Sequence, residues 1–325
     1  MSGQAASPES KRCVLIYSDD YVADIGPHVF PVAKYPMVVD ELIREYGVSP
    51  EEFIEPTVPT REQLLPVHTP EYLDDLTNIR WTPRTALSEM PLTREIVHGY
   101  LLSAGGTILA AREAVARRGF GIHIGGGFHH TFEDHAEGFC YVNDIALAIR
   151  VLQKEGLIKR AAVVDCDVHQ GNGTAHIFRN DPSVFTFSIH QENNYPVKQR
   201  SDLDIGLRDG AGDEEYLKAM RTVIPARLDG FAPELVIYVA GADPYQDDLL
   251  GGLALTKEGL AHRDELVISY CAERSIPIAS VLAGGYASDT NDTVDIHVTT
   301  CRLMLEAAGF HPNSEPERAT KSASK

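Results

Sequence analysis

The chain has 325 residues, of which 43% are hydrophobic and 23% are charged. No apolar run approaches the roughly 18 residues that a helical membrane span requires, so the composition argues against a membrane protein. The formal charge of −18 argues against direct binding to a nucleic acid backbone and suits a cationic partner, such as a lysine-rich peptide or a polyamine.

The two ends of the chain and its cysteines predict one intracellular domain. Residues 1–11 and 311–325 are polar and are expected to form flexible tails around a folded domain over 12–310. The N-terminal residues lack the apolar stretch of a secretory signal. The five cysteines are odd in number, widely spaced and without a C-x-x-C pair. We therefore expect reduced thiols and a cytoplasmic location.

Strand and helix patterns alternate along the first half of the chain. A short buried strand is predicted over 13–17, and an amphipathic helix is predicted over 37–46. Six further prolines between 49 and 91 indicate loops and short helices. A long helix is predicted over 94–118, and Gly119 marks its end.

The second half of the chain continues this alternation. Further strands are predicted at 120–124, in the apolar run that begins at Ala161, and at 183–189, 235–240 and 276–283. Further helices are predicted at 145–155 after a cap at Asn143 or Asp144, at 214–228 with a bend at Pro225, at 257–274 and at 292–308. Because no linker or internal repeat divides the pattern, we predict a single doubly wound α/β domain with a mostly parallel sheet flanked by helices.

Polar side chains follow four of the predicted strands. They are His129 with His130, the trio Asp165, Asp167 and His169, then Asp243, and finally Tyr286. Side chains alternate along an extended strand, so the three residues of the trio share one face. In open α/β sheets the carboxyl ends of the strands form the crevice in which ligands bind. We therefore expect these side chains to meet in one site.

The residue types predict a catalytic metal site. A three-ligand zinc site with one open coordination position is predicted from Asp167, His169 and Asp243. We predict that His129 and His130 transfer protons and that Asp165 orients one of these histidines. We predict that Tyr286 stabilises the oxyanion. This combination favours hydrolysis of an amide by a metal-activated water.

Five motifs in chain order resemble a known family. They are GGGFHH at 125–130, EGFCYVND at 137–144, DCDVHQGNGT at 165–174, GADPYQDDLLGGL at 241–253 and AGGY at 283–286. Together they resemble the zinc-dependent histone deacetylase family over nearly the whole chain. The class IV members look most similar, because of HVFPVAKY at 28–35, LLPVHTPEYL at 64–73, HQGNGT at 169–174 and LGGLALTKEGLAHRDELV at 250–267.

This resemblance implies the arginase/deacetylase fold and hydrolysis of an acyl amide on a lysine side chain. It assigns the same zinc ligands, acid/base histidines and tyrosine as the strand-end pattern does. It adds a tunnel for the lysine stem, formed by Gly138, Phe139, Leu250 and Tyr195. It also implies a structural potassium ion near Asp165, Asp167, His169, Ser188 and Ile189.

Two positions depart from the class I pattern of that family. Asn172 stands where class I members have a second aspartate, which weakens the charge partner of His130. Gln170 replaces a histidine that is frequent after the DxDxH motif. Neither change removes a metal ligand or Tyr286, so we expect an active enzyme.

The sequence leaves alternatives open. The main one is a deacetylase of small acetylated amines such as acetylpolyamines, with Glu89, Asp247 and Asp248 as candidate acids at the rim. A catalytically silent acyl-lysine binder is disfavoured because the ligands and Tyr286 are present. A binuclear manganese hydrolase is disfavoured because the sequence around Gly125 lacks the extra ligands. Acyl chain length, protein against small-molecule substrate, and oligomeric state stay undecided.

Overall fold

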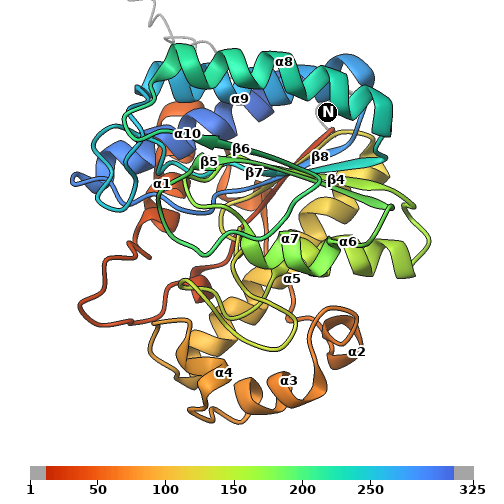
Figure 1. The fold of residues 1–325 in the computed structure, drawn as a ribbon, viewed down its shortest axis with the longest axis vertical. Helices are drawn as coiled ribbons and strands as arrows, with labels where there is room; N and C mark the ends of the chain where they lie inside the picture. The colour runs from red at the N-terminus through yellow and green to blue at the C-terminus, as the bar shows by residue number, and fades with distance from the viewer. Residues whose placement is uncertain (1–11, 311–325) are drawn as a thin grey trace, which may run out of the picture.

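The computed structural model describes residues 12–310, and these residues fold around one β-sheet (Figure 1). The tails expected at 1–11 and 311–325 lie outside the described residues. The strands of the sheet are β1 Cys13–Ile16, β2 Phe53–Ile54, β3 Phe120–His123, β4 Ala161–Asp165, β5 Val184–Gln191, β6 Leu203–Leu207, β7 Leu235–Val239 and β8 Ile278–Val281. Their order is β2-β1-β3-β8-β7-β4-β5-β6, and every neighbouring pair is parallel.

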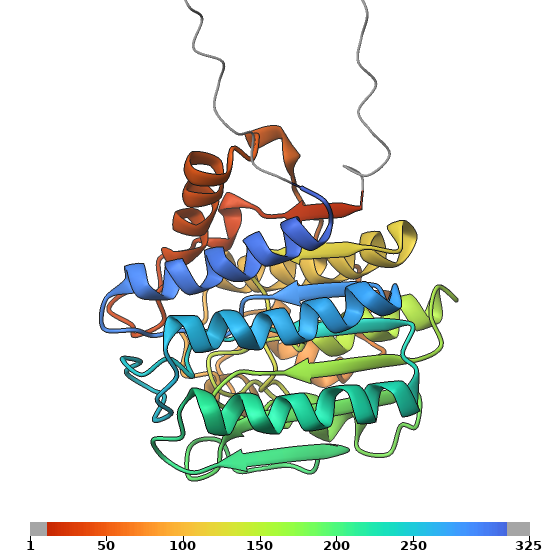
Figure 2. The ribbon, with the colours of Figure 1, turned by 90° about the horizontal axis from the view of Figure 1, so that it is seen from above.

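Helices cover both faces of this sheet. They are α1 Lys34–Tyr46, α2 Arg61–Leu64, α3 Pro70–Thr77, α4 Pro83–Ala86, α5 Arg94–Arg117, α6 Asp144–Lys154, α7 Asn172–Phe178, α8 Asp213–Phe231, α9 Lys257–Arg274 and α10 Thr290–Ala307. On one face α8, α9 and α10 lie side by side, and α1 packs against α10 (Figure 2). On the opposite face lie α5, α6 and α7, and the short helices α2 to α4 lie beyond them (Figure 1). This two-sided cover is what a sheet of apolar parallel strands requires.

Local sequence signals set the ends of several helices. The side chain of Asn143 accepts a hydrogen bond from the backbone N–H of Ala146 at 2.9 Å, so Asn143 rather than Asp144 is the cap of α6. Helix α1 ends as predicted at Gly47, which adopts a left-handed φ of 64°. Helix α5 instead ends at Arg118, which takes the left-handed conformation one residue before the predicted Gly119.

The predicted α/β class is confirmed, and the described sheet is parallel throughout. The predicted strands correspond to β1, β3, β4, β5, β7 and β8. Strands β2 and β6 and helix α7 were not predicted, and α8 was predicted to end at 228 whereas it continues to Phe231. No helix in the described part of the chain combines the length and apolar content that a membrane crossing requires.

The strands that carry the predicted site are neighbours in the sheet. They follow one another in the order β3-β8-β7-β4, and all their residues are buried. Because neighbouring parallel strands end at the same edge, the segments that follow them lie close together. The fold therefore brings the GGGFHH, DCDVH, GADP and AGGY motifs to one place.

Candidate active site

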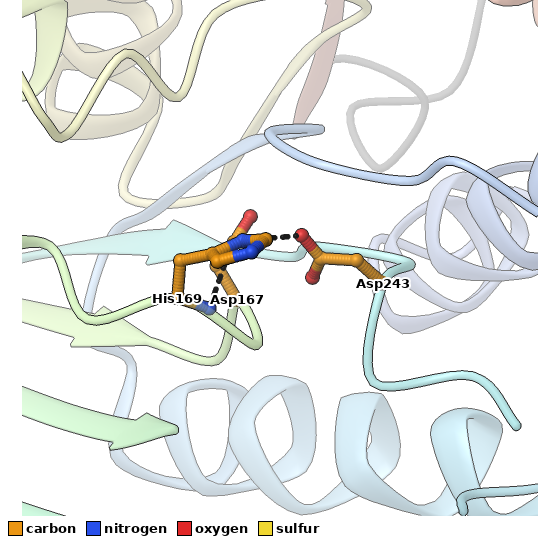
Figure 3. A group of neighbouring side chains, drawn as sticks. All are labelled: Asp167, His169 and Asp243. Atoms are coloured by element: carbon orange, nitrogen blue, oxygen red, sulfur yellow. Dashed lines mark hydrogen bonds and ion pairs between the residues drawn. The ribbon is translucent and has the colours of Figure 1, made fainter. Parts of the chain in front are cut away.

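A buried group of three side chains lies at this edge of the sheet. Asp167 and His169 follow the end of β4, and Asp243 follows the end of β7 (Figure 3). One ligand atom from each lies within 4.8 Å of the others. Nδ1 of His169 is 3.2 Å from Oδ1 of Asp167 and 3.3 Å from Oδ2 of Asp243. Among the described residues, this is the group of histidine, cysteine and acidic side chains with the spacing of a metal site.

The surroundings of this group fit a divalent cation. Oδ2 of Asp243 is buried and accepts no hydrogen bond from the described protein groups. Burial, followed by repulsion from the carboxylate of Asp167, raises the pKa of Asp243 to about 7. A Cβ at Gly284 would lie 2.6 Å from Oδ2 of Asp167 and closer still to Asp243, so glycine keeps the space between the carboxylates open. Two crowded carboxylates and an imidazole are a donor set that zinc satisfies.

Backbone N–H groups fix the orientation of both carboxylates. The N–H of His169 donates to Oδ1 of Asp167 at 2.9 Å, and the N–H of Gly284 donates to Oδ2 at 2.9 Å. The N–H of Val168 donates to Oδ1 of Asp243 at 2.8 Å. These bonds leave Oδ2 of Asp243 directed at the space between the ligands.

Two adjacent histidines face each other beside this group. Nε2 of His129 lies 3.1 Å from Nε2 of His130. On the far side, Nδ1 of His129 lies 2.7 Å from Oδ2 of Asp165, and Nδ1 of His130 lies 2.8 Å from Oδ1 of Asn172. Asp165 therefore contacts His129 rather than His130, a choice that the sequence left open.

The two histidines have opposite electrostatic environments. Burial lowers the pKa of His129, but the carboxylates of Asp165 and Asp167 outweigh this effect and raise it to about 9. Burial lowers the pKa of His130 well below its usual value, and positive charge on His129 and His169 lowers it further. The pair therefore combines one basic and one weakly basic imidazole, an arrangement suited to moving a proton between them.

A turn built from three glycines holds these histidines. Gly126 and Gly127 have φ values of 69° and 89°, which side chains rarely allow. The carboxylate of Asp144 accepts the backbone N–H groups of Gly127 at 2.9 Å and Phe128 at 2.7 Å. The sequence analysis considered Asp144 only as a helix cap. Its place at the end of the EGFCYVND motif was the available signal for a second role.

Tyr286 lies across the site from the histidines, on a turn after β8. Its backbone N–H donates to Oδ2 of Asp248 at 2.7 Å, and its ring contacts that of Phe139 at a centroid distance of 6.0 Å. Burial raises the pKa of its hydroxyl well above the usual value, with the nearby carboxylates of Asp167 and Asp243 adding to the effect. The hydroxyl therefore stays protonated at neutral pH and is available as a hydrogen-bond donor.

A fully buried lysine supports the same turn and was missed by the sequence analysis. Nζ of Lys34 donates to the backbone oxygen of Ala283 at 2.6 Å. It also lies 6.0 Å from the centroid of the Tyr286 ring. Burial lowers the pKa of Lys34 to about 8, although the nearby carboxylates oppose the shift. The only sequence signal was its position in the HVFPVAKY segment.

The site opens into a pocket of about 180 Å³. Its lining residues are Glu89, His130, Gly138, Phe139, His169, Asn194, Tyr195, Leu250 and Tyr286. The four residues expected to form a tunnel, Gly138, Phe139, Tyr195 and Leu250, therefore surround one space. Gly138 has a φ of 52°, and a Cβ there would lie 2.6 Å from Cδ2 of His130, so glycine permits this close wall.

The remaining candidate residues have structural contacts. Glu89 lines the pocket, but Asp247 does not. The carboxylate of Asp248 accepts the backbone N–H groups of Leu250 and Gly251, each at 2.8 Å, as well as that of Tyr286, so it is occupied in holding loops. The amide of Gln170 bonds both backbone groups of Gln199 and thereby anchors the loop that carries Tyr195.

Comparison with known proteins identifies the family. The histone deacetylase domain model matches residues 28–301. The chain belongs to the histone deacetylase family. It is 32% identical to histone deacetylase 2 of Arabidopsis thaliana over 287 residues, which cover 84% of this chain and 74% of that protein. It is 41% identical to an uncharacterized protein of Picosynechococcus sp. over 286 residues, which cover 87% of this chain and 95% of that protein.

A solved structure supports the same fold for this histone deacetylase family member. The crystal structure of the HDA15 HD domain superimposes with a TM-score of 0.76 and 24% sequence identity, covering 91% of this chain and 92% of that one. The arginase/deacetylase fold implied by the sequence motifs is therefore confirmed. The chain is a hydrolase of the histone deacetylase family, and the narrower class IV assignment stays a prediction.

Proposed function

We propose that this protein is a zinc-dependent deacylase that hydrolyses the acyl amide of a lysine side chain. The observation that carries the proposal is the convergence of the buried group Asp167, His169 and Asp243 with the histidine pair and Tyr286 beside one pocket, which His130, His169 and Tyr286 line. No single member of this set is diagnostic. Their common position supplies metal ligands, proton carriers and an oxyanion donor for one substrate carbonyl.

Asp167, His169 and Asp243 are the residues that would hold the zinc. When bound, zinc activates a water molecule and polarises the substrate carbonyl as a Lewis acid. The hydroxyl of Tyr286 donates a hydrogen bond to the carbonyl oxygen as negative charge develops on it. One Nε2 atom of the histidine pair accepts a proton from the attacking water, and the pair returns a proton to the departing lysine amine. Asp165 holds the imidazole of His129 through Nδ1, so that its Nε2 points toward Nε2 of His130.

The pocket walls suit the aliphatic stem of a lysine side chain. Phe139 and Tyr195 supply aromatic surface, Gly138 brings the wall close, and Leu250 adds a further apolar contact. A neutral acyl-lysine buries this stem without desolvating a charge, whereas free lysine would carry an ammonium group into the site. The walls therefore support binding of the acylated form over the product.

Two smaller cavities beside the main pocket bear on the length of the acyl group. A cavity of about 20 Å³ shares His130, Phe139 and Tyr286 with the main pocket. A mainly apolar cavity of about 20 Å³ shares Phe30 and Phe128 with the second one. An acyl chain longer than acetyl would bury its methylene groups past Phe30 only by widening these cavities.

The deciding experiment compares substrates and measures metal on the same sample. Acetyl-, octanoyl- and myristoyl-lysine peptides and acetylspermidine are assayed, and zinc content is determined by elemental analysis. We expect one zinc per chain and turnover of the peptides. An active protein without bound metal would refute the zinc assignment. Ala23→Phe, which narrows the third cavity, should lower turnover of long acyl chains and spare acetyl-lysine.

The alternative substrate is a small acetylated amine such as an acetylpolyamine. Glu89 at the pocket lining and the formal charge of −18 favour a cationic substrate. Asp248 contributes less than its sequence position suggested, because its carboxylate binds backbone N–H groups. A kcat/KM higher for acetylspermidine than for every peptide in the panel would select this alternative.

We also propose a structural potassium ion and a reducing compartment. The β4–β5 pairing places Asp165 beside Ser188, within the segment where the family resemblance implies potassium bound largely by backbone oxygens. Replacing potassium by tetramethylammonium should then lower the melting temperature. All five cysteines are free thiols, four of them buried, as suits the expected cytoplasmic location.

A further inference from the structure

Glu137 lies one layer behind the histidine pair and was assigned no role by the sequence. Its Oε1 accepts a hydrogen bond from Nδ2 of Asn172 at 2.8 Å and from the hydroxyl of Tyr195 at 3.2 Å. Its Oε2 lies 3.6 Å from Nε2 of His135. The side chain is 22% exposed, so it is partly shielded from water. Glu137 thus connects the tunnel wall to the amide that supports His130.

The chemistry of the carboxylate determines the orientation of the amide. An ionised carboxylate can only accept hydrogen bonds, so Asn172 must turn its NH₂ group toward Glu137. Its carbonyl oxygen then faces His130, in agreement with the 2.8 Å contact to Nδ1. A carbonyl oxygen also only accepts, so Nδ1 of His130 must carry the hydrogen. Nε2 of His130 is left with its lone pair, which faces Nε2 of His129 at 3.1 Å.

An asparagine alone does not impose this order. Its oxygen and NH₂ group have nearly the same shape. A flipped amide would no longer accept a hydrogen bond from Nδ1 of His130 and would instead donate one to it. The hydrogen would then move to Nε2, and the lone pair would be turned away from the reaction. The aspartate of class I members avoids this ambiguity because both of its oxygens accept.

We propose that Glu137 is a positioning residue that fixes the Asn172 amide and thereby holds His130 as the Nδ1–H tautomer. The inference rests on the proposed function insofar as that tautomer serves proton transfer. In class I members a carboxylate pairs with the histidine, whereas in this chain the side chain of Asn172 lies between the carboxylate of Glu137 and His130. Glu137 neither lines the pocket nor belongs to the Asp167, His169 and Asp243 group, and it acts through Asn172.

The state of Glu137 agrees with this role. Burial raises the pKa of Glu137, but hydrogen bonds from His135, Asn172 and Tyr195 outweigh it and lower the pKa below its ordinary value. The carboxylate is therefore ionised at neutral pH and presents acceptors alone.

The first test reads the tautomer directly. Full-length, zinc-loaded protein labelled with ¹⁵N-histidine is examined by two-bond ¹H–¹⁵N NMR, with His130→Gln used to assign the resonances. We expect a protonated Nδ1 and an unprotonated Nε2 on His130 in the wild type. We expect Glu137→Met to convert part or all of the population to the other tautomer. A wild-type His130 protonated at Nε2, or an unchanged tautomer in Glu137→Met, would overturn the proposal.

A control variant separates the two bonds of Glu137. Tyr195→Phe removes the hydroxyl that shares Oε1 of Glu137 but leaves the bond to Asn172 intact. The tautomer of His130 should stay as in the wild type. A tautomer change in Tyr195→Phe would place the effect in the tunnel wall and contradict the assignment to Glu137.

The second test compares two single substitutions, each expected to lower kcat, with the double variant, which is expected to regain activity. Glu137→Met should lower kcat by about 10- to 100-fold with little change in KM, the range for residues that orient catalytic groups. Asn172→Asp should also lower kcat, because two carboxylates then face each other at the 2.8 Å contact. The double variant should recover activity above both single variants, since a carboxylate at position 172 enforces the Nδ1–H tautomer by itself. Additive losses would contradict the proposal.

These readouts separate this proposal from the proposed function. The NMR experiment needs no turnover, so the tautomer is decided even if no acyl-lysine peptide is hydrolysed. Failure of the substrate panel with the expected tautomer change would refute the deacylase assignment alone. Turnover of acyl-lysine with a tautomer independent of Glu137 would refute the positioning role alone.

Discussion

Nε2 of His129 and Nε2 of His130 lie 3.1 Å apart, although the two residues are neighbours in sequence. Adjacent side chains on a regular strand point to opposite faces, so a pair that converges needs a turn. The glycines at 126 and 127 supply that turn, and Asp144 fixes it through two backbone N–H groups. The two histidines differ in what supports them from behind, a carboxylate for His129 and an amide for His130.

Asp165 supports His129 with a full negative charge. We expect Asp165→Asn to lower kcat by about 10- to 100-fold, because an amide removes the charge and no longer dictates which ring nitrogen carries hydrogen. The measurement is kcat and KM at saturating zinc, with Asp40→Asn on the exposed face of α1 as a matched control. Equal losses in the variant and the control would show that His129 does not depend on Asp165.

Tyr286 is expected to act in the transition state. Tyr286→Phe removes one hydroxyl from a buried ring and should lower kcat by about 100- to 1,000-fold with KM nearly unchanged. Steady-state kinetics check the rate, and elemental analysis should find the same zinc content as in the wild type. Turnover at the wild-type rate would eliminate the oxyanion role.

Metal binding should stabilise the fold. A ligand at about 1,000 times its dissociation constant stabilises the native state by about 4 kcal/mol, so removing zinc with a chelator should lower the melting temperature. Asp243→Asn should abolish this zinc-dependent increase. Without metal, the variant should be at least as stable as the wild type, because it relieves the repulsion between Asp243 and Asp167. Zinc stabilisation that survives in Asp243→Asn would contradict the ligand assignment.

Gly138 is predicted to be intolerant of a side chain for reasons of space. A Cβ there would lie 2.6 Å from Cδ2 of His130 and 2.7 Å from the Tyr195 hydroxyl. Gly138→Ala should therefore lower kcat/KM much more than Gly156→Ala does. Gly156 has a similar left-handed φ of 71° but no atom within 4 Å of the added Cβ, so it reports backbone strain alone. Equal activities of the two variants would place the effect in the backbone.

His68 should make the fold sensitive to acid. Burial lowers its pKa to about 4, and Nε2 accepts the N–H of Asn143 at 3.1 Å only while it is unprotonated. Because the folded pKa lies below the unfolded value, its contribution is present above about pH 6.5 and is lost as pH falls toward 4. The loss amounts to about 3 kcal/mol.

Urea unfolding of the wild type and His68→Gln at several pH values between 7 and 4 checks this expectation. Glutamine can both donate and accept but does not titrate, so the difference in unfolding free energy between the two proteins should shrink or reverse with falling pH. A difference that stays constant would assign the acid sensitivity to other groups.

The sequence predicted the sheet and the convergence of Asp167, His169 and Asp243 because both follow from short-range patterns. Apolar runs followed by glycine and charged residues identify strand ends, and parallel strands bring such ends together. The same reasoning missed β2, which has two residues, and β6, whose short LDIGL sequence is interrupted by aspartate and glycine, residues depleted in strands. It missed α7 because Asn172 and Gly173 are poor helix formers.

The supporting residues of the site were beyond such patterns. Lys34 contacts Ala283, 249 positions away, and Glu137 contacts Asn172, 35 positions away. Neither contact leaves a periodic trace in the sequence, because it depends on how loops from different strands pack. Motif membership was the only signal, and it did not specify a partner.

The proposed metal ligands follow two different strands, β4 and β7, and this has a consequence for the newly made chain. Val168, between two of the ligands, and Asp243, the third, are 75 positions apart, and β5, β6 and α8 lie between them in sequence. A nascent chain that has emerged only as far as β6 carries two ligands and cannot assemble the three-ligand set. We therefore expect the proposed zinc site to form only after β7 has docked against β4, so that zinc binding would report assembly of this part of the sheet.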